Sequence, residues 1–208
     1  MNSFRFCVGT EILFGKGQIE NLAKVVGRYG KRVLVTYGGG SIKKIGLYDK
    51  VMELLAGFEV YELGGIQPNP RIESVYEGVK ICREKNIEVI LAVGGGSTID
   101  CTKAIASGTF YEGDAWDMVL NPKSIKKSLP ICTILTLSAT GSEMDSGAVI
   151  SNMKENIKVG FINELNLPKA SILDPEYTFS VSAYQTAAGT ADRSEEHTSE
   201  LQSRSSIS

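Results

Sequence analysis

The sequence has little histidine, no paired cysteines and no excess of basic charge. One histidine stands among 208 residues, too few for a metal site that needs several, and the four cysteines form no C-x-x-C pair. Lysine and arginine number 22 against 24 aspartate and glutamate residues, which gives a net charge of −2 at pH 7. This balance argues against nucleic acid or an anionic membrane as a partner.

A secretion signal and long apolar runs are also missing. Residues Met1–Phe6 show no basic stretch followed by an apolar run, and no window approaches the roughly 20 apolar residues of a membrane helix. We therefore expect a cytoplasmic protein without a membrane partner. Thiols stay reduced in that compartment, and the sequence predicts small buried side chains at four positions: Cys7, Cys82, Cys101 and Cys132.

What the sequence does contain is a regular alternation of strand and helix patterns. Short β-branched runs predict strands at residues 32–37, 59–63, 89–93, 131–135, 148–151 and 170–173, and helical spacing predicts helices at 17–29, 47–56, 72–85, 97–106 and 184–192. This alternation predicts a doubly wound α/β fold with a parallel sheet covered on both faces. Residues 5–8 and 11–14, around Gly9 and Thr10, predict an N-terminal β-hairpin.

Two triglycine loops follow predicted strands and lead into predicted helices. They are Gly38–Ser41 and Gly94–Ser97. Glycine allows a phosphate to approach the backbone, and the N–H groups at the start of the next helix favour an anion. The spacing is not G-x-G-x-x-G, and one such loop fits equally well a tight turn with Ser97 as helix N-cap and Asp100 in a capping box. Two loops in equivalent positions favour nucleotide binding.

A third segment, Thr136–Glu143, places several hydroxyl groups around Gly141 directly after an apolar run. These hydroxyls could donate to phosphate or ribose. The alternative is a turn in which the side chains bond to the local backbone.

Together these motifs resemble the iron-containing, group III alcohol dehydrogenases. Three motifs carry the family resemblance: Gly94-Gly95-Gly96-Ser97-x-x-Asp100-x-x-Lys103-Ala104, Thr136-Leu137-x-Ala139-Thr140-Gly141-Ser142-Glu143 and Leu173-Asp174-Pro175. Three more are similar to the butanol dehydrogenase branch: Gly39–Lys44, Pro68–Pro70 and Gln185–Gly189. The resemblance runs from about Phe4 to Asp192 in register.

The resemblance implies which residues contact the cofactor: Gly39, Gly40, Ser41, Asn69, Gly95, Gly96, Ser97, Asp100, Thr136, Thr140, Lys158 and Tyr177. By the same resemblance, Gly95–Ser97 cradle the pyrophosphate, with Asp100 and Lys103 on the helix behind them. Thr136 and the turn at Thr140 approach the phosphates and the nicotinamide ribose. Asp145 falls where some relatives carry asparagine.

The first glycine loop bears on the choice between NAD and NADP. NAD-selective relatives place an acidic residue there, which accepts hydrogen bonds from the ribose and repels a 2′-phosphate. This chain has no carboxylate in Gly39–Ser41, and Lys43 and Lys44 follow. We expect NADPH to be accepted at least as well as NADH, although the two lysines also fit a solvated helix start.

The resemblance also implies one divalent metal, iron or zinc, held by an aspartate, a histidine four residues later and two histidines of a C-terminal helical domain. Asp192 matches the first ligand, but Glu196 stands four residues on and His197 is one residue off the helix face. The metal site and the helical metal domain are therefore expected to be missing. Arg193–Ser203 resembles translated sequencing-library adapter DNA, with a natural disordered tail as the alternative.

These expectations divide the chain into a dinucleotide-binding domain at 1–180, the first helix of a truncated helical domain at 181–192 and a foreign or disordered tail at 193–208. The resemblance implies NAD(P)H-dependent, metal-assisted interconversion of a primary alcohol and its aldehyde, by a homodimer when full length. This chain is then an inactive fragment. A polyol or glycerol dehydrogenase, or a nucleotide-binding module without catalysis, remains an alternative.

Overall fold

The computed structural model describes residues 9–191. Six parallel strands form the main sheet: β1 (Glu11–Phe14), β8 (Ala170–Leu173), β5 (Ile131–Leu135), β4 (Val89–Gly94), β2 (Arg32–Tyr37) and β3 (Glu59–Leu63), in that spatial order. A separate antiparallel hairpin consists of β6 (Gly147–Asn152) and β7 (Ile157–Ile162). The predicted doubly wound α/β fold is confirmed.

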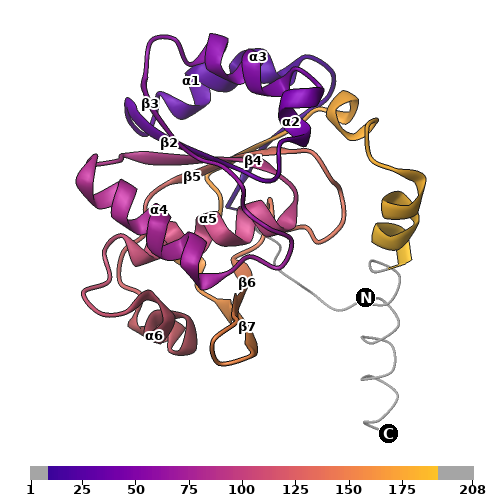
Figure 1. Cartoon of the computed structure of the whole chain (residues 1–208). Helices are drawn as coiled ribbons and strands as arrows, with labels where there is room; N and C mark the ends of the chain where they lie inside the picture. Colours follow the sequence, from indigo (N-terminus) through magenta and orange to yellow (C-terminus); the bar gives the residue numbers. More distant parts are fainter. Residues whose placement is uncertain (1–8, 192–208) are drawn as a thin grey trace, which may run out of the picture.

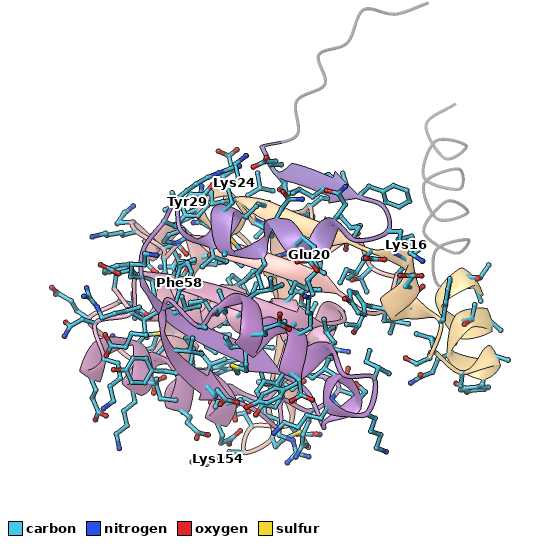
Figure 2. The ribbon with its side chains drawn as sticks, turned by 90° about the horizontal axis from the view of Figure 1, so that it is seen from above. Lys16, Glu20, Lys24, Tyr29, Phe58 and Lys154 are labelled. Carbon is cyan, nitrogen blue, oxygen red and sulfur yellow. The ribbon has the colours of Figure 1, made fainter. Side chains whose placement is uncertain are left out.

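Helices cover both faces of the sheet (Figure 1). One face carries η1 (Gln18–Asn21), α1 (Leu22–Val26), α2 (Ser41–Lys44) and α3 (Leu47–Leu54), and the other carries α4 (Ile72–Glu84), α5 (Gly96–Gly108) and α6 (Ala115–Leu120). Seen from above, η1 and α1, which carry Glu20 and Lys24, lie over the strands (Figure 2). Short turns η2 (Pro122–Ser124), η3 (Glu164–Asn166) and η4 (Pro175–Thr178) complete the described elements, with a helix over residues 183–191.

The central strands are apolar without interruption because both of their faces are covered. Every residue of β4 and β5 is buried. In β2, Leu34 packs into the apolar core beneath α4 and α5, whereas Val33 and Val35 pack into the core beneath α1 and α3. Successive side chains of a strand point to opposite faces, so one β-branched run supplies both cores.

Most predicted elements agree with the structure, and the differences are local. The predicted helix at 17–29 is wrong in extent, because η1 covers the first residues and α1 ends at Val26. The predicted strand at 148–151 forms, but it pairs with β7 outside the main sheet. Residues 5–8 of the predicted hairpin lie outside the described residues, and the strand at 11–14 pairs in parallel with β8 at the sheet edge.

Three cysteines are buried and free, as predicted: Cys82, Cys101 and Cys132. Burial raises the pKa of each thiol to about 12, so these thiols are protonated at neutral pH. Cys7 lies outside the described residues. Among residues 9–191, no helix is long and apolar enough to cross a membrane.

Candidate functional site

The order of the strands reverses between β2 and β4. From β2 the chain passes to β3 on one side, and from β4 it passes to β5 on the other side, while β2 and β4 are themselves paired. In open parallel sheets such a switch point opens a crevice beyond the carboxyl ends of the strands, where ligands bind. Both triglycine loops follow these two strands, so both lie at that crevice.

A cleft of about 360 Å³ opens at the switch point, and both glycine loops line it as the sequence predicted. Six of the predicted cofactor residues are in its lining: Gly39, Ser41, Gly95, Gly96, Ser97 and Thr136. Gly40 lies between two lining residues and has a φ of 102°, a left-handed backbone conformation that favours glycine. The first loop therefore depends on glycine for its backbone path.

The second loop is closed over by the turn that follows β5. A Cβ atom on Gly96 would lie 2.6 Å from the Oγ1 of Thr140, and one on Gly95 would lie 3.2 Å from the Cβ of Leu137. A side chain at Gly96 would therefore push the Thr140 turn away. Thr140 Oγ1 also accepts a hydrogen bond from the N–H of Ser142 at 3.4 Å. This is a side-chain bond to the local backbone, as expected for a turn.

Helix α5 begins directly at this loop. It runs over 13 residues from Gly96, with Gly95 at its N-cap and no side-chain cap. The first N–H groups of a helix have no partner inside the helix, and the helix dipole makes this end favourable for an anion. Since Gly95, Gly96 and Ser97 line the cleft, the start of α5 can accept a phosphate there.

The alternative of a capping box at Ser97 is wrong. Ser97 lies inside α5 rather than at its N-cap, and the Asp100 carboxylate bonds elsewhere. Asp100 Oδ1 accepts a hydrogen bond from Ser142 Oγ at 2.7 Å, and its Oδ2 accepts one from the Val149 N–H at 3.0 Å. Burial raises the pKa of Asp100, and the two hydrogen bonds oppose that shift. Asp100 is not among the residues that line the cleft. Its carboxylate instead holds the segment that contains Ser142 and Val149.

The three remaining predicted residues lie away from the lining. Lys158 of β7 donates a hydrogen bond to Asn69 Oδ1 at 2.7 Å. Asn69 comes directly after Pro68 in the sequence, and Pro68 lines the cleft. Tyr177 packs against the core beneath α1 and α3, where burial raises its pKa. The structure thus pairs Asn69 with Lys158 and places Tyr177, partly buried, against the core beneath α1 and α3.

Ser180, Val181 and Gln185 also line the cleft. Val181 and Gln185 belong to residues 181–192, which the sequence predicts as part of another domain. A Cβ on Gly189 would lie 3.4 Å from that of Ala139, so the helix over residues 183–191 packs on the turn after β5. No residue pattern in 180–185 pointed to the cleft, because contacts to loops distant in sequence leave no local signal.

The predicted metal ligand Asp192 lies outside the described residues. Among residues 9–191, no group of three or more His, Cys, Asp or Glu side chains is arranged to hold a metal ion. In the described part of the chain, the two glycine loops and the start of α5 line the cleft, where a phosphate can approach the backbone N–H groups.

Fold and cleft define a doubly wound α/β domain with two glycine loops at its switch point. Residues 9–175 match the family model of iron-containing alcohol dehydrogenases, and the chain belongs to this family. It is 55% identical over 194 residues to NADH-dependent butanol dehydrogenase A of Clostridium acetobutylicum, covering 92% of this chain and 50% of that protein. NADPH-dependent aldehyde reductase YqhD of Escherichia coli is 44% identical over 195 residues, with coverage of 92% and 50%.

Solved structures agree with this assignment. The crystal structure of NADH-dependent butanol dehydrogenase A from Thermotoga maritima superposes with a TM-score of 0.88 at 43% identity, covering 92% of this chain and 49% of that one. The chain thus spans about half the length of the relatives it matches. The resemblance seen in the motifs is confirmed.

Proposed function

We propose that the chain forms the dinucleotide-binding half of an NAD(P)H-dependent alcohol dehydrogenase that interconverts a primary alcohol and its aldehyde. One observation carries the proposal: two glycine loops and the start of α5 line a single cleft at the switch point between β2 and β4. Butanol dehydrogenases at 50–55% identity support this substrate class over a polyol.

In this proposal the N–H groups of Gly95, Gly96 and Ser97 hold the pyrophosphate, with Thr136 and the Thr140 turn on the opposite wall. The Thr140 turn can pack this closely on the loop because Gly96 lacks a Cβ. When bound, the dinucleotide supplies or accepts the hydride. The residues of the two loops would then orient the dinucleotide, and the contact between Gly96 and the Thr140 turn would exclude water from that side.

The proposal assigns the metal to residues beyond the described part. A divalent metal supplies Lewis acidity toward the alcohol oxygen in enzymes of this reaction type. Asp192 is the position in this chain that would contribute to it. Because residues 9–191 hold no cluster of three or more His, Cys, Asp or Glu side chains that could bind a metal, we derive no step of the reaction through a metal here.

We propose NADPH as a dinucleotide that the site accepts at least as well as NADH. The first loop offers no carboxylate to a 2′-phosphate, and Lys43 Nζ lies 4.5 Å from the ring centre of Tyr48 and 5.2 Å from that of Tyr37, beside the loop. The relatives at 50–55% identity are named as NADH-dependent, and those named as NADPH-dependent are 44% and 32% identical, so this proposal rests on the loop and not on the relatives.

The cleft is tested by adding one methyl group. Gly96→Ala is expected to raise the Kd for NADPH about tenfold, equivalent to ~1.4 kcal/mol, because its Cβ displaces Thr140. Thr140→Ala in the same chain removes the clashing Oγ1 and is expected to restore part of the affinity. Gly57→Ala, where a Cβ meets nothing within 4 Å, is the control. Binding is followed by calorimetric titration, and equal Kd values for wild type and Gly96→Ala would contradict the assignment.

A further inference from the structure

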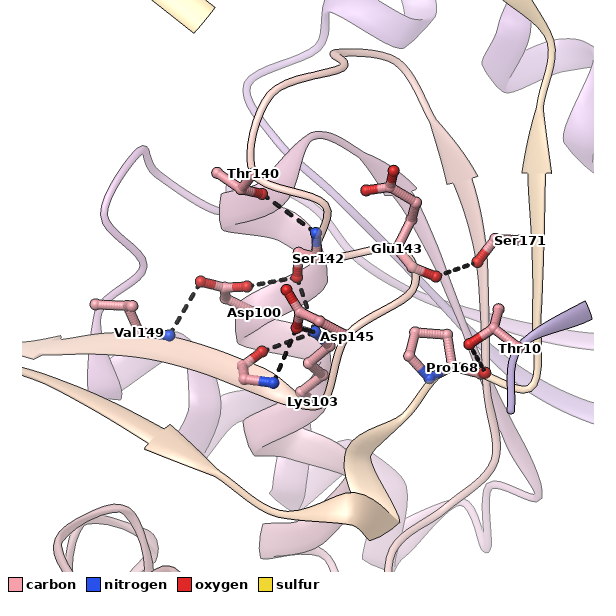
Figure 3. A network of polar contacts seen from close by, with 11 residues as sticks. Thr10, Asp100, Lys103, Thr140, Ser142, Glu143, Asp145, Val149, Pro168 and Ser171 are labelled. Atoms are coloured by element: carbon pink, nitrogen blue, oxygen red, sulfur yellow. Dashed lines mark hydrogen bonds and ion pairs between the residues drawn. The ribbon is translucent and has the colours of Figure 1, made fainter. Parts of the chain in front are cut away.

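Lys103 on α5 is a charged side chain with no exposure to solvent. Its Nζ donates three hydrogen bonds, to Ser142 Oγ at 2.9 Å, to Asp145 Oδ1 at 2.8 Å and to the Gly147 carbonyl at 2.7 Å (Figure 3). An ammonium group has three N–H donors, so all of them are used. All three acceptors lie between Ser142 and Gly147, where the chain passes from the Thr140 turn into the first residue of β6.

Asp100, one turn earlier on the same helix, holds the same segment. Its carboxylate accepts hydrogen bonds from Ser142 Oγ and from the Val149 N–H, at 2.7 Å and 3.0 Å. Ser142 Oγ therefore lies between Asp100 and Lys103 (Figure 3). Two side chains three residues apart share a helix face, so one face of α5 binds the segment 142–149 from end to end.

Burial of this charge is costly unless every donor is paired. Burial lowers the pKa of Lys103, and the neighbouring Asp145 carboxylate opposes the shift. Asp145 itself is about half exposed, with a side-chain exposure of 49%, so the ion pair spans from the core to the surface. An apolar side chain could fill the same space but could not bind three polar groups of one loop.

We infer that Lys103 is a positioning residue: it holds the Thr140 turn, on one side of the cleft, in place against Gly95–Ser97 on the other side. The first turn of α5 forms one wall with Gly95–Ser97, and the segment held by Lys103 continues into the Thr140 turn, which lies on Gly96. The same helix thereby fixes both sides of the cleft. The part of this inference that concerns dinucleotide affinity rests on the proposed function.

The test compares Lys103→Met with wild type in the full chain by hydrogen–deuterium exchange without ligand. Loss of the three bonds is expected to speed exchange in residues 137–147 at least about tenfold, with little change in β4 and α4. Ile105→Val, a core change on the same helix, and Lys80→Met, an exposed lysine on α4, are the controls. Neither control is expected to speed exchange in that segment selectively.

A second readout is the Kd for NADPH measured on folded protein. Lys103→Met is expected to weaken binding about tenfold or more, while Ile105→Val leaves the Kd unchanged. A merely structural role would instead raise exchange throughout α5 and β4 and leave the Kd of the folded fraction unchanged, and that outcome overturns the inference. Wild-type protein that binds no dinucleotide refutes the proposed function, yet the exchange result without ligand still decides whether Lys103 positions the segment.

Should Lys103→Met fail to fold, Ser142→Ala and Asp145→Asn test the network from the loop side. Ser142→Ala removes one acceptor of Lys103 and the donor to Asp100, so faster exchange in 137–147 is expected. Asp145→Asn keeps an amide oxygen but removes the charge, and a smaller effect is expected. Exchange in that segment equal to wild type in both variants overturns the inference.

Discussion

Gly39 is the position in the first glycine loop where a side chain meets neither a neighbouring atom nor a left-handed backbone angle, since Gly40 has a φ of 102° and Gly38 approaches the Ile66 carbonyl. It lines the cleft, and a Cβ there would meet nothing within 4 Å. By contrast, Gly96 has no room for a Cβ because Thr140 lies against it. A substitution at Gly39 therefore changes the chemistry of the loop without moving its neighbours, and this makes it the residue at which the choice of dinucleotide can be altered.

Gly39→Asp is expected to shift the preference from NADPH toward NADH. A carboxylate there accepts hydrogen bonds from the ribose hydroxyls and repels a 2′-phosphate, and a tenfold change in kcat/KM ratio corresponds to about 1.4 kcal/mol. Steady-state kinetics of the full-length enzyme with both dinucleotides measures the ratio. Gly57→Asp adds the same charge away from the cleft and serves as control. A wild-type preference of tenfold or more for NADH would contradict the reasoning about this loop.

Much of the cleft at the scale of residues was predictable, because its core consists of glycines that follow strands. Gly95, Gly96 and Ser97 line the cleft, and their contact with a cofactor stays a prediction. Asp100 does not line the cleft, since its partners Ser142 and Val149 come from a loop more than 40 residues away in the sequence. Such a pairing depends on tertiary packing, which local spacing does not encode.

At the scale of elements, β2 is held at its start by Glu88. The Glu88 carboxylate accepts hydrogen bonds from the N–H groups of Lys31 and Arg32 at 2.8 Å and 3.0 Å, and from the Arg32 guanidinium at 2.8 Å. The backbone hydrogen bonds from Arg32 and Lys31 hold the pKa of Glu88 below its usual value of 4.5. Its stabilising contribution is therefore present above about that pH and is lost as the pH falls through the lowered value.

Glu88→Gln is expected to lower the free energy of unfolding at pH 7 and to have a diminishing effect as the pH falls below 4.5. Urea denaturation of both proteins across this range measures the difference. Glu84→Gln, at an exposed carboxylate 4.0 Å from Lys80, is the control and should show little effect at any pH. A Glu88→Gln effect that is the same at pH 3 and pH 7 would refute the role of the charge.

The contact between α4 and α5 depends on a glycine within a helix. A Cβ on Gly78 would overlap the side chain of Ile105, with Cγ1 at 2.7 Å. Gly78→Ala is expected to destabilise the fold, since overpacking costs about 1–3 kcal/mol and outweighs the helix propensity gained, about 1 kcal/mol. Urea midpoints of Gly78→Ala and of the control Gly57→Ala give the comparison. An unchanged or higher midpoint for Gly78→Ala would show that the helices separate without cost.

Strands were easier to predict than helix ends. The runs at 32–37, 59–63, 131–135 and 170–173 coincide with β2, β3, β5 and β8. In β2 and β5 the apolar run is nearly continuous because both faces of these inner strands are covered. Helix α1 ends early, at Val26, before the turn that contains Gly27 and Gly30. The pairing of β6 with β7 was not predictable, since an exposed strand such as β7 has weak hydrophobic alternation.

At the scale of the whole molecule, the carboxyl edge of the sheet carries a second hollow of about 290 Å³. Phe14, Leu135, Leu173 and Pro175 contribute to its lining, and Phe14 is 71% exposed. Nearby in sequence, Phe179 and Tyr184 are 77% and 83% exposed. Large apolar side chains on the surface are typical of an interface. The relatives have about twice the length of this chain.

The central proposal is that this chain supplies a dinucleotide site and that a metal-dependent reaction needs metal ligands outside residues 9–191. The direct test measures butanal reduction, as loss of NADPH absorbance, together with bound iron and zinc, in the 208-residue chain and in a longer protein in which the remaining half of a butanol dehydrogenase relative follows Asp192. The account predicts stoichiometric metal and turnover in the longer protein and neither in the 208-residue chain. Stoichiometric metal with turnover in the 208-residue chain, or a longer protein that binds metal yet reduces no aldehyde, would contradict it.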